Sequence, residues 1–252
     1  MSTSPPKIHA YPSSHEVELR RQLLADFKNC PIPDKERLAN LGLFLNRPAL
    51  SRLLFLHELY QRILPVHGVI MEFGVRWGQS LAVFSCLRGI YEPYNYNRKI
   101  VGFDTFSGFP TVSGADQGRE RIETGQYAVT ENYEAYLRRI LDYHEQESPL
   151  AHIRKYELVV GDACQTLPRY LKENPETIVA LAYFDFDLYE PTKVCLEALR
   201  PHITRGTVLG FDELNSRVFP GETEAVREVL GLDRYRIQRN PFNPMPSYIV
   251  VD

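Results

Sequence analysis

Five short apolar segments recur along the sequence, and each carries an acidic residue within it or within two residues of its end. The segments are 69–74, 99–103, 156–160, 178–184 and 207–211. Segments with a helical spacing of apolar residues separate them, and this alternation predicts an α/β fold whose parallel sheet is covered by helices on both faces. Two short runs near the end, 235–237 and 248–251, predict a closing antiparallel pair. We therefore expect a doubly wound, Rossmann-like, mainly parallel sheet of seven strands.

The remaining sequence divides into an N-terminal part and a long insertion. Residues 1–64 comprise a polar arm followed by helices, which we expect to pack on the core, and residues 65–252 hold the sheet domain. After Asp104 come roughly fifty residues in a connection that normally needs far fewer. A long excursion at this edge of a sheet is typical of a lid, which we expect over about 105–155. The alternative is a solvated insertion without a role.

Composition and charge exclude several classes of protein. The 252 residues include 29 Lys and Arg against 32 Asp and Glu, which gives a formal net charge of -3. This slightly acidic balance argues against a nucleic-acid partner, because proteins of that class carry basic surfaces. No apolar run approaches the roughly 20 residues that span a bilayer, and the polar N-terminus lacks the apolar centre of a signal peptide. We expect a cytoplasmic protein with no membrane partner.

The acidic residues at the strand ends are the strongest functional signal in the sequence. In a doubly wound sheet the carboxyl ends of the strands form one edge, and ligands bind outside it. A buried charge without a partner is costly, so several such charges at one edge need a reason. One aspartate at such a position is often only a helix cap, but a converging group indicates a site. The residues concerned are Glu72, Asp104, Asp162, Asp185 and Asp212.

The first strand-to-helix turn has the properties of a cofactor-binding loop. It reads Glu72-Phe-Gly-Val-Arg-Trp-Gly78, and its glycines let a ligand approach the backbone closely. The helix that begins near Ser80 offers N–H groups to a carboxylate or phosphate. Asp104 is placed to accept hydrogen bonds from ribose hydroxyls, and Asp162 is the candidate for the adenine edge. The turn lacks the GxGxxG pattern, which argues against an NAD-dependent dehydrogenase.

A second group of acids suits a divalent cation. Asp185 follows the fourth apolar segment and Asp212-Glu213 follows the fifth, so their oxygens converge if these strands are neighbours. Hard oxygen ligands favour Mg²⁺ over zinc, which prefers His and Cys. We expect Asp187, which lies beyond the strand, to support the site or cap a helix. The alternative is that Asp212 caps a turn and Asp185 pairs with Arg or Lys.

Together these segments resemble the macrocin O-methyltransferase family. The matching segments are 72–80, 102–110, 185–192 and the acidic pair 212–213, in the same order over roughly residues 50–250. The family usually reads Val-Trp-Arg-Gly-Gly-Ser where this chain has Val75-Arg-Trp-Gly-Gln-Ser80. It also has Asp-Asp at the position of Asp212-Glu213, and Gly at that of Phe186. These departures concern the identity of the substrate more than the type of reaction.

The resemblance implies an S-adenosylmethionine- and Mg²⁺-dependent enzyme that methylates a deoxysugar hydroxyl in antibiotic or secondary-metabolite biosynthesis. The implied cofactor-binding residues are Glu72, Gly74, Gly78, Ser80, Asp104 and Asp162. The implied metal ligands are Asp185, Asp212 and Glu213. Asp185 is also the candidate general base, because the strand end sets it beside the bound hydroxyl. We expect a small sugar-containing acceptor, either nucleotide-linked or already attached to a product, and a homo-oligomeric enzyme.

Two other functions remain open at this point. The acceptor could be a catechol or another phenol, because methyltransferases of that kind share the metal architecture. The chain could instead be a non-catalytic subunit that binds an adenosine cofactor. Acids at every predicted strand end favour the enzyme over the subunit.

Overall fold

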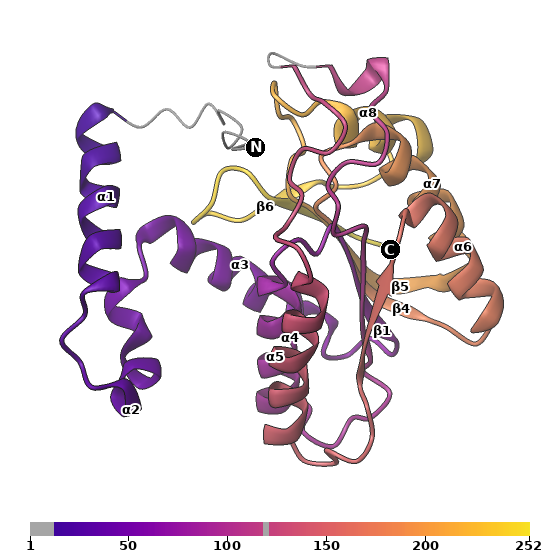
Figure 1. Cartoon of the computed structure of the whole chain (residues 1–252). Coiled ribbons are helices and arrows are strands. Elements are labelled where there is room, and N and C mark those ends of the chain that lie inside the picture. The colour runs from indigo at the N-terminus through magenta and orange to yellow at the C-terminus, as the bar shows by residue number, and fades with distance from the viewer. Residues whose placement is uncertain (1–12, 118–120) are drawn as a thin grey trace. The chain divides into compact units, whose positions relative to one another are not determined.

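The computed structural model describes residues 13–117 and 121–252, and Figure 1 shows its helices and strands. The chain divides into two compact units, residues 1–52 and 53–252. The smaller unit is helical and the larger unit contains the sheet.

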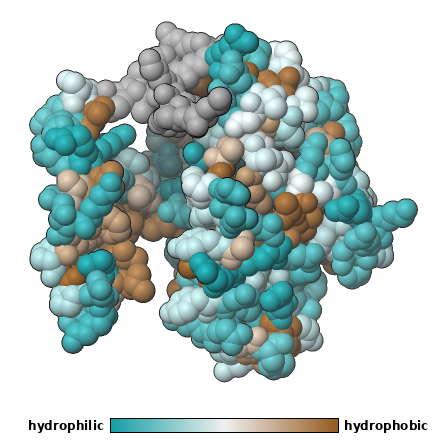
Figure 2. All heavy atoms as spheres, viewed as in Figure 1, coloured by the Kyte–Doolittle hydropathy of each residue, from teal (hydrophilic) through white to brown (hydrophobic). Residues whose placement is uncertain are grey.

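The smaller unit owes its helices to local sequence signals. Its elements are α1 (Ser14–Lys28), α2 (Asp34–Arg37), the 3-10 segment η1 (Leu38–Phe44) and the start of α3 (Arg47–Ile63). Ser13 and Glu16 form a capping box at the start of α1. None of the residues of α1, α2 and η1 is buried, and Figure 2 shows apolar side chains at the surface of this unit. The expected packing of these helices on the core stays a prediction.

One seven-stranded sheet forms the centre of the larger unit, with strand order β3-β2-β1-β4-β5-β7-β6. The strands are β1 (Val69–Phe73), β2 (Ile100–Asp104), β3 (Tyr156–Val160), β4 (Val179–Phe184), β5 (Ile203–Phe211), β6 (Gln238–Arg239) and β7 (Ser247–Val250). The strands β1 to β5 pair in parallel, and β7 pairs antiparallel with β5 and β6. This confirms the predicted doubly wound sheet. The strand order reverses between β1 and β4, which makes that position the switch point.

The closing pair forms, but the prediction of a strand at 235–237 is wrong. The strand β6 comprises Gln238 and Arg239, which pair with Tyr248 and Ser247. The side chain of Asn240 accepts the N–H groups of the two turn residues that follow at 242 and 243, which fixes where the chain reverses. Pairing with β7 and the position of this turn therefore decide which residues form β6. The apolar character of the preceding run does not decide it.

Helices cover both faces of the sheet (Figure 1), and the core accordingly forms two clusters. The helices α4 (Gln79–Tyr91) and α5 (Tyr133–Glu147), with α3 beyond residue 52, cover one face. The other face is covered by α6 (Ala163–Glu173), α7 (Tyr189–Leu199) and α8 (Gly221–Val229). No helix in the described part of the chain has both the length and the apolar character of a membrane span.

The helix α5 occupies the second half of the insertion that we predicted as a lid over 105–155. Its Leu137 and Leu141 are buried in the first core cluster, and the helix packs against α4. This half of the insertion is therefore part of the helical layer on the sheet. A lid function stays a prediction for the part of the insertion that precedes α5.

Buried charges join the segments that precede the strands, at the edge opposite the strand ends. Arg88 donates hydrogen bonds to the Glu145 carboxylate and to the carbonyl oxygen of Lys155, the latter at 2.7 Å. Arg98 donates to the carbonyl oxygens of Gly68 at 2.7 Å and Val66 at 2.8 Å. Both arginine side chains are 2% exposed. A buried ion pair that loses one partner leaves an uncompensated charge, so this network is a weak point of the fold.

We predict that Arg88→Met lowers the free energy of unfolding by about 3–5 kcal/mol, because Glu145 would keep only Lys155 as a buried cation and the buried carbonyl oxygen of Lys155 would lose its donor. Urea unfolding measured by circular dichroism checks this. The control is Arg154→Met, which breaks an ion pair with Asp142 whose side chains are 66% and 47% exposed and should cost less than about 1 kcal/mol. Equal effects of the two substitutions would contradict the prediction.

Candidate active site

The turn after β1 lies at the switch point and contacts the loop after β4. Gly74 and Gly78 have positive φ values of 89° and 75°. A Cβ atom on Gly74 would come within 2.0 Å of the carbonyl oxygen of Asp185, so only glycine fits there. Gly78 precedes α4, in whose first turn Ser80 is buried. The predicted cofactor turn and the predicted catalytic acid are therefore adjacent.

Glu72 and Asp104 lie on neighbouring strands, as predicted. Glu72 is buried in β1 opposite Gly102 of β2. Asp104 ends β2, and its carboxylate accepts hydrogen bonds from the N–H groups of Arg76 and Phe106, the former at 2.8 Å. Burial raises the pKa of Asp104, and these backbone hydrogen bonds offset only part of that effect. Asp104 thus holds together the turns after β1 and β2.

Asp162 follows β3 and caps α6. Its carboxylate accepts a hydrogen bond from the N–H group of Cys164 at 2.9 Å. This is the ordinary capping role of a single aspartate at a strand end. Its additional role at the adenine edge stays a prediction.

The loops after β4 and β5 gather the second group of acids. Asp187 lies among the carboxylates of Asp185, Asp212, Glu213 and Glu222. Burial, and then the negative charges of these neighbours, raises the pKa of Asp187 well above its ordinary value. The structure therefore brings the predicted metal ligands and Asp187 into one acidic cluster, which we define as these five residues.

Glu222 was not predicted, and it connects the two loops of the acidic cluster. It is buried in the first turn of α8. One of its carboxylate oxygens accepts the N–H group of Asp187 at 3.4 Å and the other accepts that of Glu213 at 3.1 Å. Burial raises the pKa of Glu222 well above its ordinary value. Acids are common in the first turn of a helix because they favour its dipole, so nothing in the sequence distinguished this one.

Asp212 has a partner that fixes its orientation. The hydroxyl group of Tyr183, a fully buried residue of β4, donates a hydrogen bond of 2.6 Å to the Asp212 carboxylate. The continuous apolar run of β4 predicts that Tyr183 is buried, but it does not predict this contact between neighbouring strands.

Four of the loops at this edge contain a non-glycine residue with positive φ. These residues are Arg76 after β1, Phe106 after β2, Asp187 after β4 and Asn215 after β5, with φ values from 47° to 65°. Such conformations cost about 1–3 kcal/mol each and are concentrated at functional sites. The backbone at the carboxyl ends of the strands therefore has the properties of a site that is shaped for a ligand.

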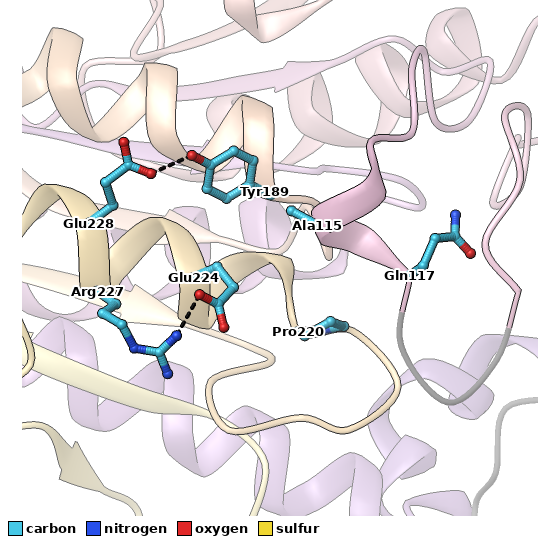
Figure 3. A pocket seen from close by; sticks show the side chains of 7 residues that line it. All are labelled: Ala115, Gln117, Tyr189, Pro220, Glu224, Arg227 and Glu228. Carbon is cyan, nitrogen blue, oxygen red and sulfur yellow. Dashed lines mark hydrogen bonds and ion pairs between the residues drawn. The ribbon is translucent and has the colours of Figure 1, made fainter.

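The insertion reaches the same edge through Asp116. This buried carboxylate accepts the N–H groups of Ser113, at 2.6 Å, and of Tyr189, the first residue of α7. A cavity of about 580 Å³ opens beside it and is lined by Ala115, Gln117, Tyr189, Pro220, Glu224, Arg227 and Glu228. Figure 3 shows that its charged groups are paired, Arg227 with Glu224 and Glu228 with the Tyr189 hydroxyl. The cavity thus lies next to the first turns of α7 and α8, and its charged side chains are occupied by one another or by a hydroxyl.

Comparison with solved structures identifies the family. The crystal structure of CalS11, a calicheamicin methyltransferase, matches with a TM-score of 0.93 and 47% identity over 99% of each chain. A structure of apo CalS11, described as a TDP-rhamnose 3'-O-methyltransferase of calicheamicin biosynthesis, matches with a TM-score of 0.85 and 45% identity over 96% of each chain. The chain belongs to the sugar O-methyltransferase family.

A more distant comparison shows a shared fold alone. The O-methyltransferase NovP shares the fold with a TM-score of 0.58 and 18% identity over 80% of this chain and 79% of its own. No protein-family model and no curated protein sequence matches the chain. The resemblance to sugar O-methyltransferases of antibiotic biosynthesis is nevertheless confirmed, and the enzyme is an S-adenosylmethionine-dependent methyltransferase. The roles of its individual site residues stay predictions.

We predict that Glu222→Ala lowers kcat about 10–100-fold, because residues that orient catalytic or metal-binding groups typically contribute that much. Glu222→Gln keeps one acceptor oxygen, so its kcat should fall less than that of Glu222→Ala. The matched control is Glu224→Gln, which lies in the same helical turn but is half exposed and paired with Arg227. Steady-state kinetics measure kcat for each variant, and a melting curve checks that each variant is folded. Wild-type kcat in the alanine variant would contradict this role.

Proposed function

We propose that this enzyme transfers the methyl group of S-adenosylmethionine to a hydroxyl of a nucleotide-linked deoxysugar, TDP-rhamnose or a close analogue, in the biosynthesis of an antibiotic-type natural product. The observation that carries this proposal is the match over 99% of the chain, at 47% identity, to CalS11. CalS11 is described as a TDP-rhamnose 3'-O-methyltransferase. Similarity at this level over 99% of the chain includes the loops that we propose to shape the acceptor site.

The cofactor is proposed to lie across the switch point. The glycine turn at 74–78 and buried Ser80 would hold its methionine end, with Glu72 beneath the turn. Asp104 would bind the ribose. A carboxylate has about four acceptor positions, and Asp104 uses up to three of them for the backbone N–H groups of Val75, Arg76 and Phe106. A ribose hydroxyl would use the remaining capacity.

Asp185 is the proposed general base. Its backbone lies directly against Gly74, so its loop adjoins the point where the methyl group would be presented. In-line transfer requires the acceptor oxygen, the methyl carbon and the sulfur to be held in one geometry. The acceptor hydroxyl, placed between the turn and Asp185, would lose its proton to that carboxylate as the carbon–oxygen bond forms and the bond from the methyl carbon to the cofactor sulfur breaks, which releases S-adenosylhomocysteine.

We further propose that Asp185, Asp212 and Glu213 hold Mg²⁺. Among residues 13–117 and 121–252, no three side chains are positioned as a complete ligand set. The chemistry of the acidic cluster nevertheless fits a hard cation, because several carboxylates lie close together at a partly buried edge. When bound, the ion would supply a Lewis acid that lowers the pKa of the acceptor hydroxyl. Tyr183 and Glu222 would orient the ligands.

Phenol methylation and a non-catalytic role are less well supported. The CalS11 structures that match almost the whole chain are those of a sugar methyltransferase. Glu222, Tyr183 and the strained loops also orient the acids in a way that cofactor binding alone does not require. A cytoplasmic location and a homo-oligomeric state stay part of the proposal.

The acceptor class is tested by mass spectrometry of reactions with S-adenosylmethionine. We predict that TDP-rhamnose gains one methyl group, whereas free rhamnose and catechol react at least about 100-fold more slowly, because each lacks groups that the site binds. A boiled-enzyme reaction is the control. Turnover of catechol in preference to the nucleotide sugar would overturn the proposal.

The catalytic acids are tested by Asp185→Asn and Asp212→Asn. We predict that each lowers kcat at least about 1000-fold, because positioned acid–base and metal-ligating groups contribute on that scale. The affinity for S-adenosylmethionine, measured by calorimetry, should change little. EDTA should silence the wild type and added Mg²⁺ should restore it. Full activity in chelator would rule out the metal.

A further inference from the structure

Arg76, in the turn after β1, is a cation at an edge otherwise rich in acids. Its position is one at which the sequence departs from the family pattern, with Arg-Trp in place of Trp-Arg. Its φ of 47° is positive, and its N–H group donates to the Asp104 carboxylate at 2.8 Å. A backbone held in this strained conformation fixes the direction in which the side chain leaves the turn.

The side chain of Arg76 crosses toward the insertion. Its guanidinium carbon lies 4.6 Å from the centre of the Tyr127 ring and 6.0 Å from that of Trp77. Tyr127 in turn lies 6.2 Å from Phe219, in the loop between β5 and α8, and 5.2 Å from Phe109, measured between ring centres. These contacts connect the cofactor turn with the loop that carries part of the acidic cluster.

The guanidinium of Arg76 forms no salt bridge among the described residues, and its side chain is exposed. Its positive charge lies near enough to Asp104 to offset part of the rise in the pKa of that carboxyl. The cations beside the cavity differ, because Arg227 pairs with Glu224 and Lys193 pairs with Glu228. A guanidinium that stacks on an aromatic ring keeps its N–H edge available, and that edge matches two oxygens of a phosphate.

A nucleotide-linked sugar would bring two negative phosphates to this acidic edge. Nearby cations would offset the resulting repulsion, and Arg76 would add a fixed one to the proposed Mg²⁺. We propose that Arg76, stacked on Tyr127, binds the diphosphate group of the acceptor and so selects nucleotide-linked sugars over free sugars. This inference rests on the proposed function. A carboxylate, such as that of the methionine end of the cofactor, would suit the same guanidinium, and the experiment separates the two.

The test compares Arg76→Gln and Arg76→Lys with Arg139→Gln. Arg139 is a matched control, because its guanidinium carbon lies 5.4 Å from the Tyr136 ring on the exposed face of α5. We expect Arg76→Gln to raise the KM for TDP-rhamnose about 10–100-fold, with a change in kcat below about 3-fold. Calorimetry should show the same loss for thymidine diphosphate and unchanged affinity for S-adenosylmethionine. The KM of Arg76→Lys for TDP-rhamnose should lie between those of the wild type and Arg76→Gln, since Lys keeps the charge but cannot form the bidentate contact.

Three results would overturn the inference. The first is weaker S-adenosylmethionine binding in Arg76→Gln with unchanged KM for the nucleotide sugar, which would assign Arg76 to the cofactor. The second is a loss on Arg217→Gln, an exposed cation of the loop after β5, without a loss on Arg76→Gln. The third is equal thymidine diphosphate binding by the wild type and Arg76→Gln. If the wild type methylates no nucleotide sugar, the proposed function fails, while the calorimetry still tests Arg76.

Discussion

The contact between the Gly74 backbone and the Asp185 carbonyl oxygen is the constraint on which the site depends. A methyl group on Gly74 would clash with the Asp185 carbonyl oxygen, because an added Cβ would lie 2.0 Å from it. The contact exists because the chain forms β2 and β3 on one side of β1 and then crosses to form β4 on its other side, which makes β1 and β4 neighbours. Their two loops therefore meet at the switch point. One loop is suited to the methyl donor and the other to the acceptor, so the topology brings the reactants together.

Acidic side chains hold this edge in shape as well as giving it charge. Asp104 binds N–H groups of the turns after β1 and β2, and Glu222 binds N–H groups of the loops after β4 and β5. Asp116 similarly ties the insertion to the start of α7. These carboxylates stabilise loops with positive φ values that would otherwise be unfavourable. Arg76 is one of the residues held by Asp104, and its guanidinium adds a positive charge to this acidic edge.

Much of this was predictable from sequence, because the strands are apolar and buried on both sides. The parallel strands, the helices between them and the acids at their ends all follow from local patterns. Glu222 and Asp116 did not, because their importance lies in contacts with backbone groups far away in the sequence. The strand at 235–237 was misplaced because pairing with β7 and the Asn240 turn, not apolar character, fixed it. The sequence also did not show that α5 belongs to the core and not to a lid, because an apolar helix side does not reveal which surface it packs against.

A crystal structure with S-adenosylhomocysteine and TDP-rhamnose both bound is the most direct test of this arrangement of donor and acceptor. We predict the cofactor sulfur against the glycine turn at 74–78, an acceptor hydroxyl beside the Asp185 carboxylate, and the diphosphate within hydrogen-bonding distance of Arg76. A sugar seated instead in the cavity between Tyr189 and Arg227, away from Asp185, would contradict it.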